Sequence, residues 1–528
     1  MKSKFISFVS ILIFLTSPIF SQVPGITTST LPLLVINTNG QTIQESGKIT
    51  STMKLIYNGV GKVNKPTDAG NIYSGNIGIE YRGSASLTEQ NPYNFETRDA
   101  TGANLDVSLL GMPAENDWVL LSNYNDKTFI RNSLAFQLFY KMAHYAPRTK
   151  MVEVIVNNEY QGIYILTEKI KQDKGRVDIS KLAVTDISGD NLTGGYIFKI
   201  DSYDQTDSWQ SNFKPIDHQD KTVHYVYDDP GATDLVQVQK DYLKTAVNSF
   251  ESVLYSPGFA NKTTGYAAWI KMNSFLDFFI VSEVSRNINA YTKNCYFFKN
   301  KDTKDNKFHA GPVWNFDDSF KNMSDCDAFA ATDGSGWGYK INDCPNITNY
   351  SNGWMVRLVQ DPAFVDALNS RYTLMRNSYL SSQYLNSFID SVQNQAKEAQ
   401  ARHYAKWNIL GQSETYDGQV LKMKNWIQTR LTWLDGHLPG IATSSVEIED
   451  GFSYRIFPNP VSDVVYLESS SEIQNIRFFS ADGTCILSKD GLSIFSTRVS
   501  VSDFSPGIYL VQLKIKGNQI IHSKLVIQ

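Results

Sequence analysis

Residues 311–320 (GPVWNFDDSF) hold the side chains best suited to chemistry, because two carboxylates and an amide follow an aromatic strand end. Hard oxygen ligands that converge from a rigid element are what a magnesium and phosphate site needs. We therefore expect Asp317, Asp318 and Asn315 to hold a metal ion. The amide of Asn315 serves this purpose less well than a carboxylate would.

Charged side chains elsewhere in the chain could complete such a site. Glu168 and Lys169 are adjacent at the end of a probable strand, so they point to opposite faces and at most one of them faces a given site. Glu168 could pair with a basic residue elsewhere, and the alternative is a solvent-exposed strand edge. Arg82 and Arg131 are donors suited to phosphate, although structural ion pairs are the alternative for both.

Length and composition indicate a large globular protein. The chain has 528 residues with 42% hydrophobic content, which is enough for two or more domains. Lys2 and Lys4 precede an apolar run over residues 5–15, which predicts a secretory signal over residues 1–21 and cleavage before Gln22. The run is too short for a membrane anchor, and no later segment reaches about 20 apolar residues. Cleavage removes two lysines, so the net charge of −4 becomes −6, which does not favour nucleic-acid binding.

The cysteines and histidines do not predict a metal framework. The chain has 4 Cys and 7 His without C-x-x-C or H-E-x-x-H spacing. Cys326 and Cys344 flank a Gly-rich and Asp-rich loop, so they could form a disulfide in an oxidising compartment. Two unpaired thiols are the other possibility, and the sequence leaves both open.

Hydrophobic periodicity predicts an α+β fold for the larger part of the chain. Residues 151–156 and 162–166 read as a hairpin around Asn157 and Asn158. We expect further strands at residues 196–200, 295–299 and 308–316, and helices at residues 234–254, 274–289, 363–379, 385–404 and 420–434.

A linker and a small tail follow. Residues 442–455 are rich in small and acidic residues and separate the two parts of the chain. Beyond them, short alternating strands at residues 464–467, 476–479 and 508–513 predict a small β-sandwich over residues 456–528.

The tail resembles the C-terminal sorting domain of the Bacteroidetes type IX secretion system. The resemblance rests on residues 457–463 (FPNPVSD), 482–483 (DG), 507–511 (GIYLV) and 524–527 (KLVI). It implies export through the Sec pathway and then the type IX machinery, with release or anchoring at the outer-membrane surface. A generic adhesive β-module is the alternative.

Roughly residues 30–435 resemble the CotH kinase family, which comprises atypical protein kinases of the spore-coat type, and the resemblance implies a domain over residues 22–441. The resemblance rests on a series of blocks in order: 82–86 (RGSAS), 109–113 (LLGMP), 116–120 (NDWVL), 126–132 (DKTFIRN), 145–149 (YAPRT), 160–170 (YQGIYILTEKI), 173–178 (DKGRVD), 194–201 (GGYIFKID) and 311–314 (GPVW). It implies a two-lobed kinase-like fold. A kinase site needs a cation against the phosphates, an acid that positions it and carboxylates on the metal, and these roles point to Arg82, Lys169 or Arg131, to Glu168, and to Asp317.

The chain departs from the family pattern in three places. Residues 89–95 (EQNPYNF) are one residue shorter than the Pro-Lys-Lys-Ser-Tyr-like segment of relatives, and they lack its lysine. Asn289 stands where relatives carry the acid that orients the acceptor, and an amide cannot take up a proton at neutral pH. Asn315 replaces the first acid of a W-D-F-D pattern; if the segment stays a strand, Asn315 and Asp317 share a face and Asp317 could compensate.

Two functions follow from this resemblance. The first is an exported kinase that uses ATP with magnesium or manganese and phosphorylates Ser or Thr hydroxyls of a secreted or surface protein. The second is an impaired pseudokinase that serves as a cell-surface scaffold or as a carbohydrate- or protein-binding module. Trp209, Trp337 and Trp354 would support carbohydrate binding if they lined one exposed face, and core positions are the alternative.

Overall fold

The computed structural model describes residues 25–83, 89–324, 326–439, 454–480, 483–517 and 520–527. The predicted signal peptide and most of the predicted linker lie outside these ranges. The chain divides into two compact units. We call residues Met1–Tyr124, Lys150–Leu166 and Gln395–Ser413 the barrel unit, and Asn125–Thr149, Thr167–Asn394 and Glu414–Gln528 the helical unit. The two-lobed kinase-like arrangement stays a prediction.

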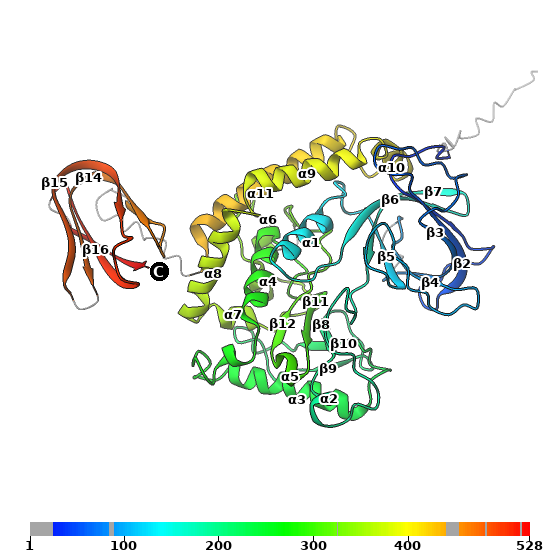
Figure 1. Cartoon of the computed structure of the whole chain (residues 1–528), viewed down its shortest axis with the longest axis horizontal. Helices are drawn as coiled ribbons and strands as arrows, with labels where there is room; N and C mark the ends of the chain where they lie inside the picture. The colour runs from blue at the N-terminus through cyan, green and yellow to red at the C-terminus, as the bar shows by residue number, and fades with distance from the viewer. Residues whose placement is uncertain are drawn as a thin grey trace, which may run out of the picture. The chain divides into compact units, whose positions relative to one another are not determined.

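The barrel unit is built around a closed barrel whose strands follow the order β1-β2-β3-β4-β5-β7-β6 (Figure 1). Alternate residues of these strands point into one apolar core, which includes Leu34, Phe95, Trp118, Val154 and Tyr164. The strands are β1 (Leu33–Asn37), β2 (Ile49–Ile56), β3 (Tyr73–Tyr81), β4 (Tyr93–Arg98), β5 (Asp117–Ser122), β6 (Thr149–Val156) and β7 (Glu159–Glu168).

The predicted hairpin over residues 151–166 is confirmed by β6 and β7. Asn157 and Asn158 form its turn with φ of 51° and 65°, a left-handed geometry that asparagine tolerates well. Helix α10 (Gln400–Lys406) belongs to the same unit, and the ring of its His403 accepts a hydrogen bond from the backbone nitrogen of Ile163 at 3.0 Å. Burial lowers the pKa of His403 to about 3, so the ring is neutral and can accept this bond.

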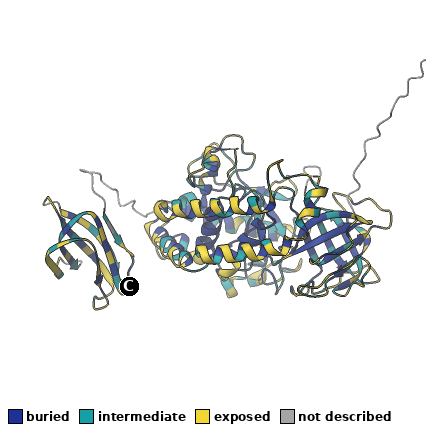
Figure 2. Ribbon diagram, turned by 90° about the horizontal axis from the view of Figure 1, so that it is seen from above, coloured by how far each residue is buried: buried dark blue, intermediate teal, exposed yellow. Residues whose placement is uncertain are grey.

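The helical unit contains an antiparallel sheet in the order β12-β11-β8-β10-β9. Its strands are β8 (Tyr196–Ile200), β9 (Ser208–Gln210), β10 (His224–Asp229), β11 (Cys295–Lys299) and β12 (Phe308–Ala310). The longer helices are α1 (Arg131–Lys141), α3 (Gln237–Leu254), α4 (Met272–Ser285), α8 (Pro362–Arg376), α9 (Ser382–Ala396) and α11 (Tyr416–His437), and Figure 2 shows their buried and exposed stripes. Short helices are α2 (Gly189–Leu192), η2 (Tyr266–Ala268), α5 (Asp302–Asp305), α6 (Asp327–Ala330), η3 (Gly338–Asp343) and α7 (Trp354–Leu358).

Aromatic side chains fill the core of the helical unit. The Trp354 ring packs against Phe250, Phe297 and Tyr225 and is only 1% exposed. Trp209 is also buried, whereas Trp337 is half-buried. Two of the three tryptophans considered for a carbohydrate platform are therefore core residues.

Three predicted elements differ from the structure. The strand expected over residues 308–316 ends at Ala310, because Pro312 has no amide hydrogen with which to continue the pairing. The helix expected over residues 274–289 ends at Ser285, where Arg286 takes a left-handed conformation with φ of 42°. The helix expected over residues 385–404 is instead two helices, α9 and α10, which a turn at residues 397–399 separates.

The C-terminal tail is rich in strands. Its strands β13 (Tyr454–Phe457), β14 (Val464–Ser480), β16 (Gly507–Ile515) and β17 (Ile520–Ile527) pair in that order, and β15 (Cys485–Ser500) pairs with β14. The strands predicted at residues 464–467 and 476–479 are two parts of β14, which has irregular register between Glu468 and Asn475. The sandwich arrangement stays a prediction. None of the described helices combines the length and apolarity that crossing a membrane requires.

Candidate active site

The segment over residues 311–320 is an ordered loop rather than a strand. Gly311 has φ of 105°, and a Cβ atom there would lie 2.8 Å from the Phe139 ring, so this position requires glycine. Asn315 also has a left-handed conformation, with φ of 61°. The premise that Asn315 and Asp317 share the face of a strand is therefore wrong, because the backbone turns between them.

Helix α1 holds the middle of this loop through Asn132. The buried Asn132 side chain accepts a hydrogen bond from the backbone nitrogen of Phe316 at 2.8 Å, and it donates one to the carboxylate of Asp317. The single amide thus fixes both the backbone and the side chain of neighbouring residues. Asp317 itself is half-buried.

Arg131, next to Asn132, holds the end of the loop. Its Nε donates to Asp126 at 3.0 Å, and its terminal nitrogen donates to the carbonyl oxygens of Ser319 at 2.5 Å and Phe320 at 2.9 Å. These contacts bury the guanidinium against the loop backbone. They are the contacts of a residue that positions the loop, and a phosphate role for Arg131 stays a prediction.

Asn287 brings the two predicted amide positions together. Its side chain donates to the carbonyl oxygen of Asn315 at 2.9 Å and accepts from the backbone nitrogen of Asn289 at 3.0 Å. Asn289 and Asn315 are both half-buried. Both are held through their backbone atoms, so the contacts with Asn287 do not depend on which side chain stands at either position.

Asp318 has a different partner from Asp317. Its carboxylate lies 2.7 Å from Nζ of Lys321, and both side chains are 30% exposed. This ion pair is partly screened by solvent, and a metal ion at Asp318 would compete with Lys321 for the same carboxylate.

Glu168 lies at the end of β7 and is fully buried. Its carboxylate accepts hydrogen bonds from Arg148, from the backbone nitrogen at 2.9 Å and from the guanidinium at 2.8 Å. The sequence predicted a basic partner for Glu168 but did not identify it. Arg148 lies within the block at residues 145–149, which was the only sequence signal that could have indicated it.

The neighbouring tyrosine reflects the same buried charge. Burial raises the pKa of Tyr145 well above its usual range, and the charge of Glu168 adds to this effect. Lys169 is exposed, consistent with adjacent strand residues pointing to opposite faces, and its carbonyl oxygen accepts a hydrogen bond from Arg176. Arg82 belongs to the barrel unit, is half-buried, and donates its backbone nitrogen to the carbonyl oxygen of Pro92.

Comparison with protein-family models decides the family. A model described as CotH kinase protein matches residues 79–434, which is more than half of the chain. The chain belongs to the CotH kinase family. A second model, for a secretion system C-terminal sorting domain, matches residues 455–528. This sorting tail indicates secretion and localisation at the cell surface. A search of curated proteins finds no match.

A network of buried charges lies in the CotH domain beside the candidate loop. Glu283 accepts hydrogen bonds from the backbone nitrogens of Gly338 and Tyr339, from the Tyr291 hydroxyl and from Arg430. Burial lowers the pKa of Arg430 to about 10, and Glu283 acts in the opposite direction. The network fixes the end of α4, which leads directly into the turn that carries Asn287 and Asn289.

Arg286 and a disulfide hold the Gly-rich loop of the CotH domain. The Arg286 guanidinium donates to the carbonyl oxygens of Phe329, Ala331 and Ser335. Cys326 and Cys344 form a disulfide, which decides between the two possibilities that the sequence left open. The remaining cysteines, Cys295 and Cys485, are free thiols.

The donor set at the candidate site fits Mg²⁺-ATP poorly. Of its acidic side chains, Asp317 is bound by Asn132 and Asp318 is paired with Lys321, and positions 289 and 315 supply only neutral amides. Mg²⁺ favours carboxylates in near-octahedral geometry. Within the part of the chain that the structure describes, the group of three metal-ligating His, Cys, Asp or Glu residues lies elsewhere, at Asp217, His218 and Asp343.

Proposed function

We propose that this CotH-family protein is a pseudokinase that acts at the cell surface as a protein-binding scaffold. The observation that carries the proposal is the pair of amides at Asn289 and Asn315, which Asn287 holds together through backbone atoms. A phosphoryl-transfer site needs one acid that orients the acceptor hydroxyl and others that hold the metal. Because an amide neither accepts a proton at neutral pH nor neutralises a cation, both tasks are impaired.

The architecture that we infer for this function has three parts. The barrel unit and the larger part of the helical unit form the lobes of an atypical kinase-like fold over residues 22–441. A signal peptide over residues 1–21 starts export, and a β-sandwich over residues 456–528 directs the chain to the type IX machinery. The burial of Trp209 and Trp354 favours a protein partner over a carbohydrate at this fold.

A second candidate is an active kinase, and the buried pair of Glu168 and Arg148 favours it. A buried acid that orients a cation is one of the parts that phosphoryl transfer requires, and the Arg148 side chain is 35% exposed. Asp317 also keeps a carboxylate. In this case the protein would transfer the γ-phosphate of ATP, with Mg²⁺ or Mn²⁺, to Ser or Thr hydroxyls of a secreted or surface protein.

The experiment that separates the two candidates measures nucleotide binding and phosphate incorporation in the purified chain. The thermal unfolding midpoint is recorded with and without ATP and with Mg²⁺ or Mn²⁺, and a generic protein acceptor is incubated with γ-labelled ATP. A scaffold without nucleotide chemistry shows no metal-dependent rise in midpoint and no incorporation. Metal-dependent incorporation by the natural chain, lost in Asp317→Asn, would overturn the pseudokinase proposal.

A double variant tests whether the amides are the cause. Asn289→Asp with Asn315→Asp restores both acids without changing the size of either side chain. If the amides disable the site, the double variant gains nucleotide-dependent stabilisation or incorporation that the natural chain lacks. The matched control is Asn289→Ala with Asn315→Ala, which removes the amides without adding charge and should remain inactive.

A further inference from the structure

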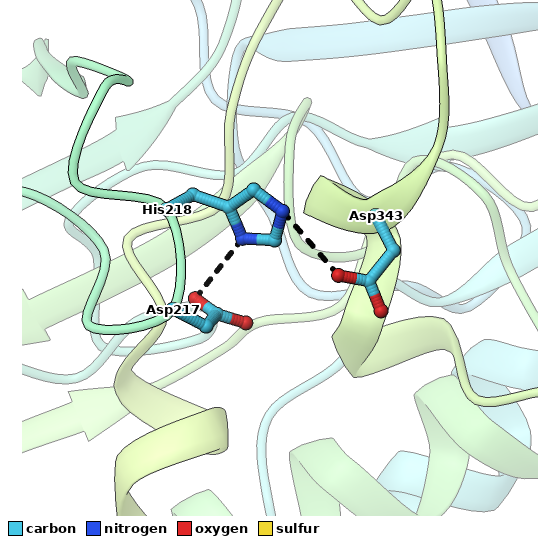
Figure 3. Close-up of side chains that lie close together, drawn as sticks. All are labelled: Asp217, His218 and Asp343. Carbon is cyan, nitrogen blue, oxygen red and sulfur yellow. Dashed lines mark ion pairs between the residues drawn. The ribbon is translucent and has the colours of Figure 1, made fainter.

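Three side chains outside the candidate active site converge on one point. The His218 ring lies between two aspartates, with Nδ1 3.3 Å from a carboxylate oxygen of Asp217 and Nε2 3.3 Å from one of Asp343 (Figure 3). One potential ligand atom from each residue lies within 4.8 Å of the others. An imidazole nitrogen and two carboxylate oxygens are donors that metal ions use in proteins, and the three side chains would have to draw closer together to share one ion.

Hydrogen bonding does not explain this arrangement. Nδ1 of His218 is buried and has no hydrogen-bond partner, although a carboxylate lies 3.3 Å away. The carboxylate therefore lies off the direction in which a ring N–H would donate. A neutral imidazole carries one N–H group, so only a protonated ring could pair with both aspartates at once.

Among the described residues, the positive charge that could pair with either aspartate is that of a protonated His218. Throughout the described residues, neither Asp217 nor Asp343 forms an ion pair with a lysine or an arginine. Lys221 pairs instead with Asp220 at 2.8 Å, and both Lys214 and Lys340, each three residues from one of the aspartates, are exposed. Two carboxylates around one ring would repel each other, and a bound cation would relieve that repulsion.

The two backbone segments that carry these ligands are fixed independently. The loop with Asp217 and His218 is closed by hydrogen bonds from His218 to Pro215 and from Lys221 to His218, each 3.1 Å long. Asp343 is the last residue of η3, whose first two backbone nitrogens donate to Glu283, and the next residue is the disulfide-bonded Cys344. The backbone at both ligand positions is thus held in place without a metal, which reduces the entropic cost of binding one.

We propose that Asp217, His218 and Asp343 form a structural site for a divalent transition-metal cation of the zinc or manganese class. The mixed nitrogen and oxygen donors favour such ions over Ca²⁺ and Mg²⁺, which prefer ligand sets made only of oxygen. Three protein ligands leave the remaining positions to water. The bound cation joins the loop at residues 215–218 to the disulfide-linked end of η3, and this role does not depend on nucleotide chemistry.

The test measures binding of the metal alone to the purified chain, without nucleotide. Cys485 is an exposed thiol that could bind zinc by itself, so the experiment uses a Cys485→Ser background. Titration with ZnCl₂ or MnCl₂ should show one saturable site and a rise in the thermal unfolding midpoint. CaCl₂ and MgCl₂ at the same concentrations should give smaller rises.

Matched variants assign the effect to these residues. His218→Gln and Asp343→Asn should each weaken metal binding by at least ~10–100-fold, because each removes one of three ligands. Asp220→Asn removes a neighbouring exposed carboxylate that already pairs with Lys221, and it should bind metal like the parent chain. Asp343 is 60% exposed, so its variant should fold even if His218→Gln does not.

Two results would overturn the proposal. One is equal metal binding by the parent chain and both ligand variants, which would place the cation elsewhere. The other is no binding and no change in midpoint at millimolar Zn²⁺ or Mn²⁺, which would leave the three residues as an ion-pair cluster only. Both are separate from the outcome of the nucleotide experiment, because no ATP is present.

Discussion

Two neighbouring regions of the helical unit differ in the polar side chains that they hold and in how these side chains are bonded. In the network of buried charges at the end of α4, Glu283 is fully buried and accepts hydrogen bonds from four groups, including Arg430. At the candidate site, Asn289 and Asn315 are neutral and half-buried, and only their backbone atoms bond to Asn287. The network at the end of α4 thus depends on the charge of Glu283, whereas the contacts of positions 289 and 315 with Asn287 do not require a charged side chain.

The largest expected effect on the free energy of unfolding comes from removing the buried charge of Glu283. Glu283→Ala leaves Arg430 buried without its partner, and breaking a buried ion pair from one side costs about 3–5 kcal/mol. Urea unfolding of the purified chain measures this loss. The control is Asp390→Asn, which breaks a largely exposed pair with Lys424 and should cost less than about 1 kcal/mol. Equal losses in the free energy of unfolding for the two variants would show that the buried pair of Glu283 and Arg430 stabilises the fold no more than an exposed pair does.

A second buried acid, Glu251, makes the stability of the folded chain depend on pH. Burial raises the pKa of Glu251 to about 7, although hydrogen bonds from Ser211, Tyr225 and Trp354 oppose this effect. Because the folded chain holds the proton more tightly than the unfolded chain, the stabilising contribution is complete below about pH 4.5 and is lost as the pH rises through about 7. The difference between the pKa of Glu251 in the folded chain and its ordinary value corresponds to roughly 3 kcal/mol in the free energy of unfolding.

Glu251→Gln should remove this dependence without disturbing the packing. The retained Oε1 can still accept from the Tyr225 hydroxyl and the Trp354 ring nitrogen, and the new amide can donate to the Ser211 hydroxyl. We expect the natural chain to lose stability from pH 5 to pH 8 relative to this variant. Urea unfolding at several pH values measures the difference, and parallel curves would show that Glu251 does not titrate in this range.

An intermediate effect on stability is expected at Asn132, which joins α1 to the candidate loop at residues 311–320. Asn132→Ala leaves the backbone nitrogen of the buried Phe316 without its acceptor and removes the hydrogen bond that Asn132 donates to Asp317, which costs about 1–3 kcal/mol. Gln137→Ala on the same helix is the control, because its bond to Tyr384 is only partly buried. A loss no larger than in the control would mean that α1 does not hold the loop.

The sequence predicted elements whose signals are local. Periodicity located α3, α8 and α11 to within a few residues, and the two asparagines of the β6–β7 turn predicted the hairpin, whereas α1 and the strands β1 to β5 were not predicted. The end of β12 at Ala310 was missed, because Val313, Trp314 and Phe316 continue a strand-like apolar pattern in the sequence, although Pro312 cannot donate to a strand ladder. The pairing of Glu168 with Arg148 and of Asp317 with Asn132 was also missed. These partners lie 20 and 185 residues apart, and no periodic pattern joins such positions.

The smallest expected effect is at Asn289 itself. Its backbone nitrogen bonds to Asn287, and among the described residues its side chain forms no hydrogen bond, so Asn289→Asp should change the free energy of unfolding by no more than about 0.5 kcal/mol. Urea unfolding without metal or nucleotide measures this change. A loss above 2 kcal/mol would mean that the fold itself requires a neutral side chain there. A small change would instead show that the acid can return at little structural cost, so its absence reflects what the site does and not what the fold tolerates.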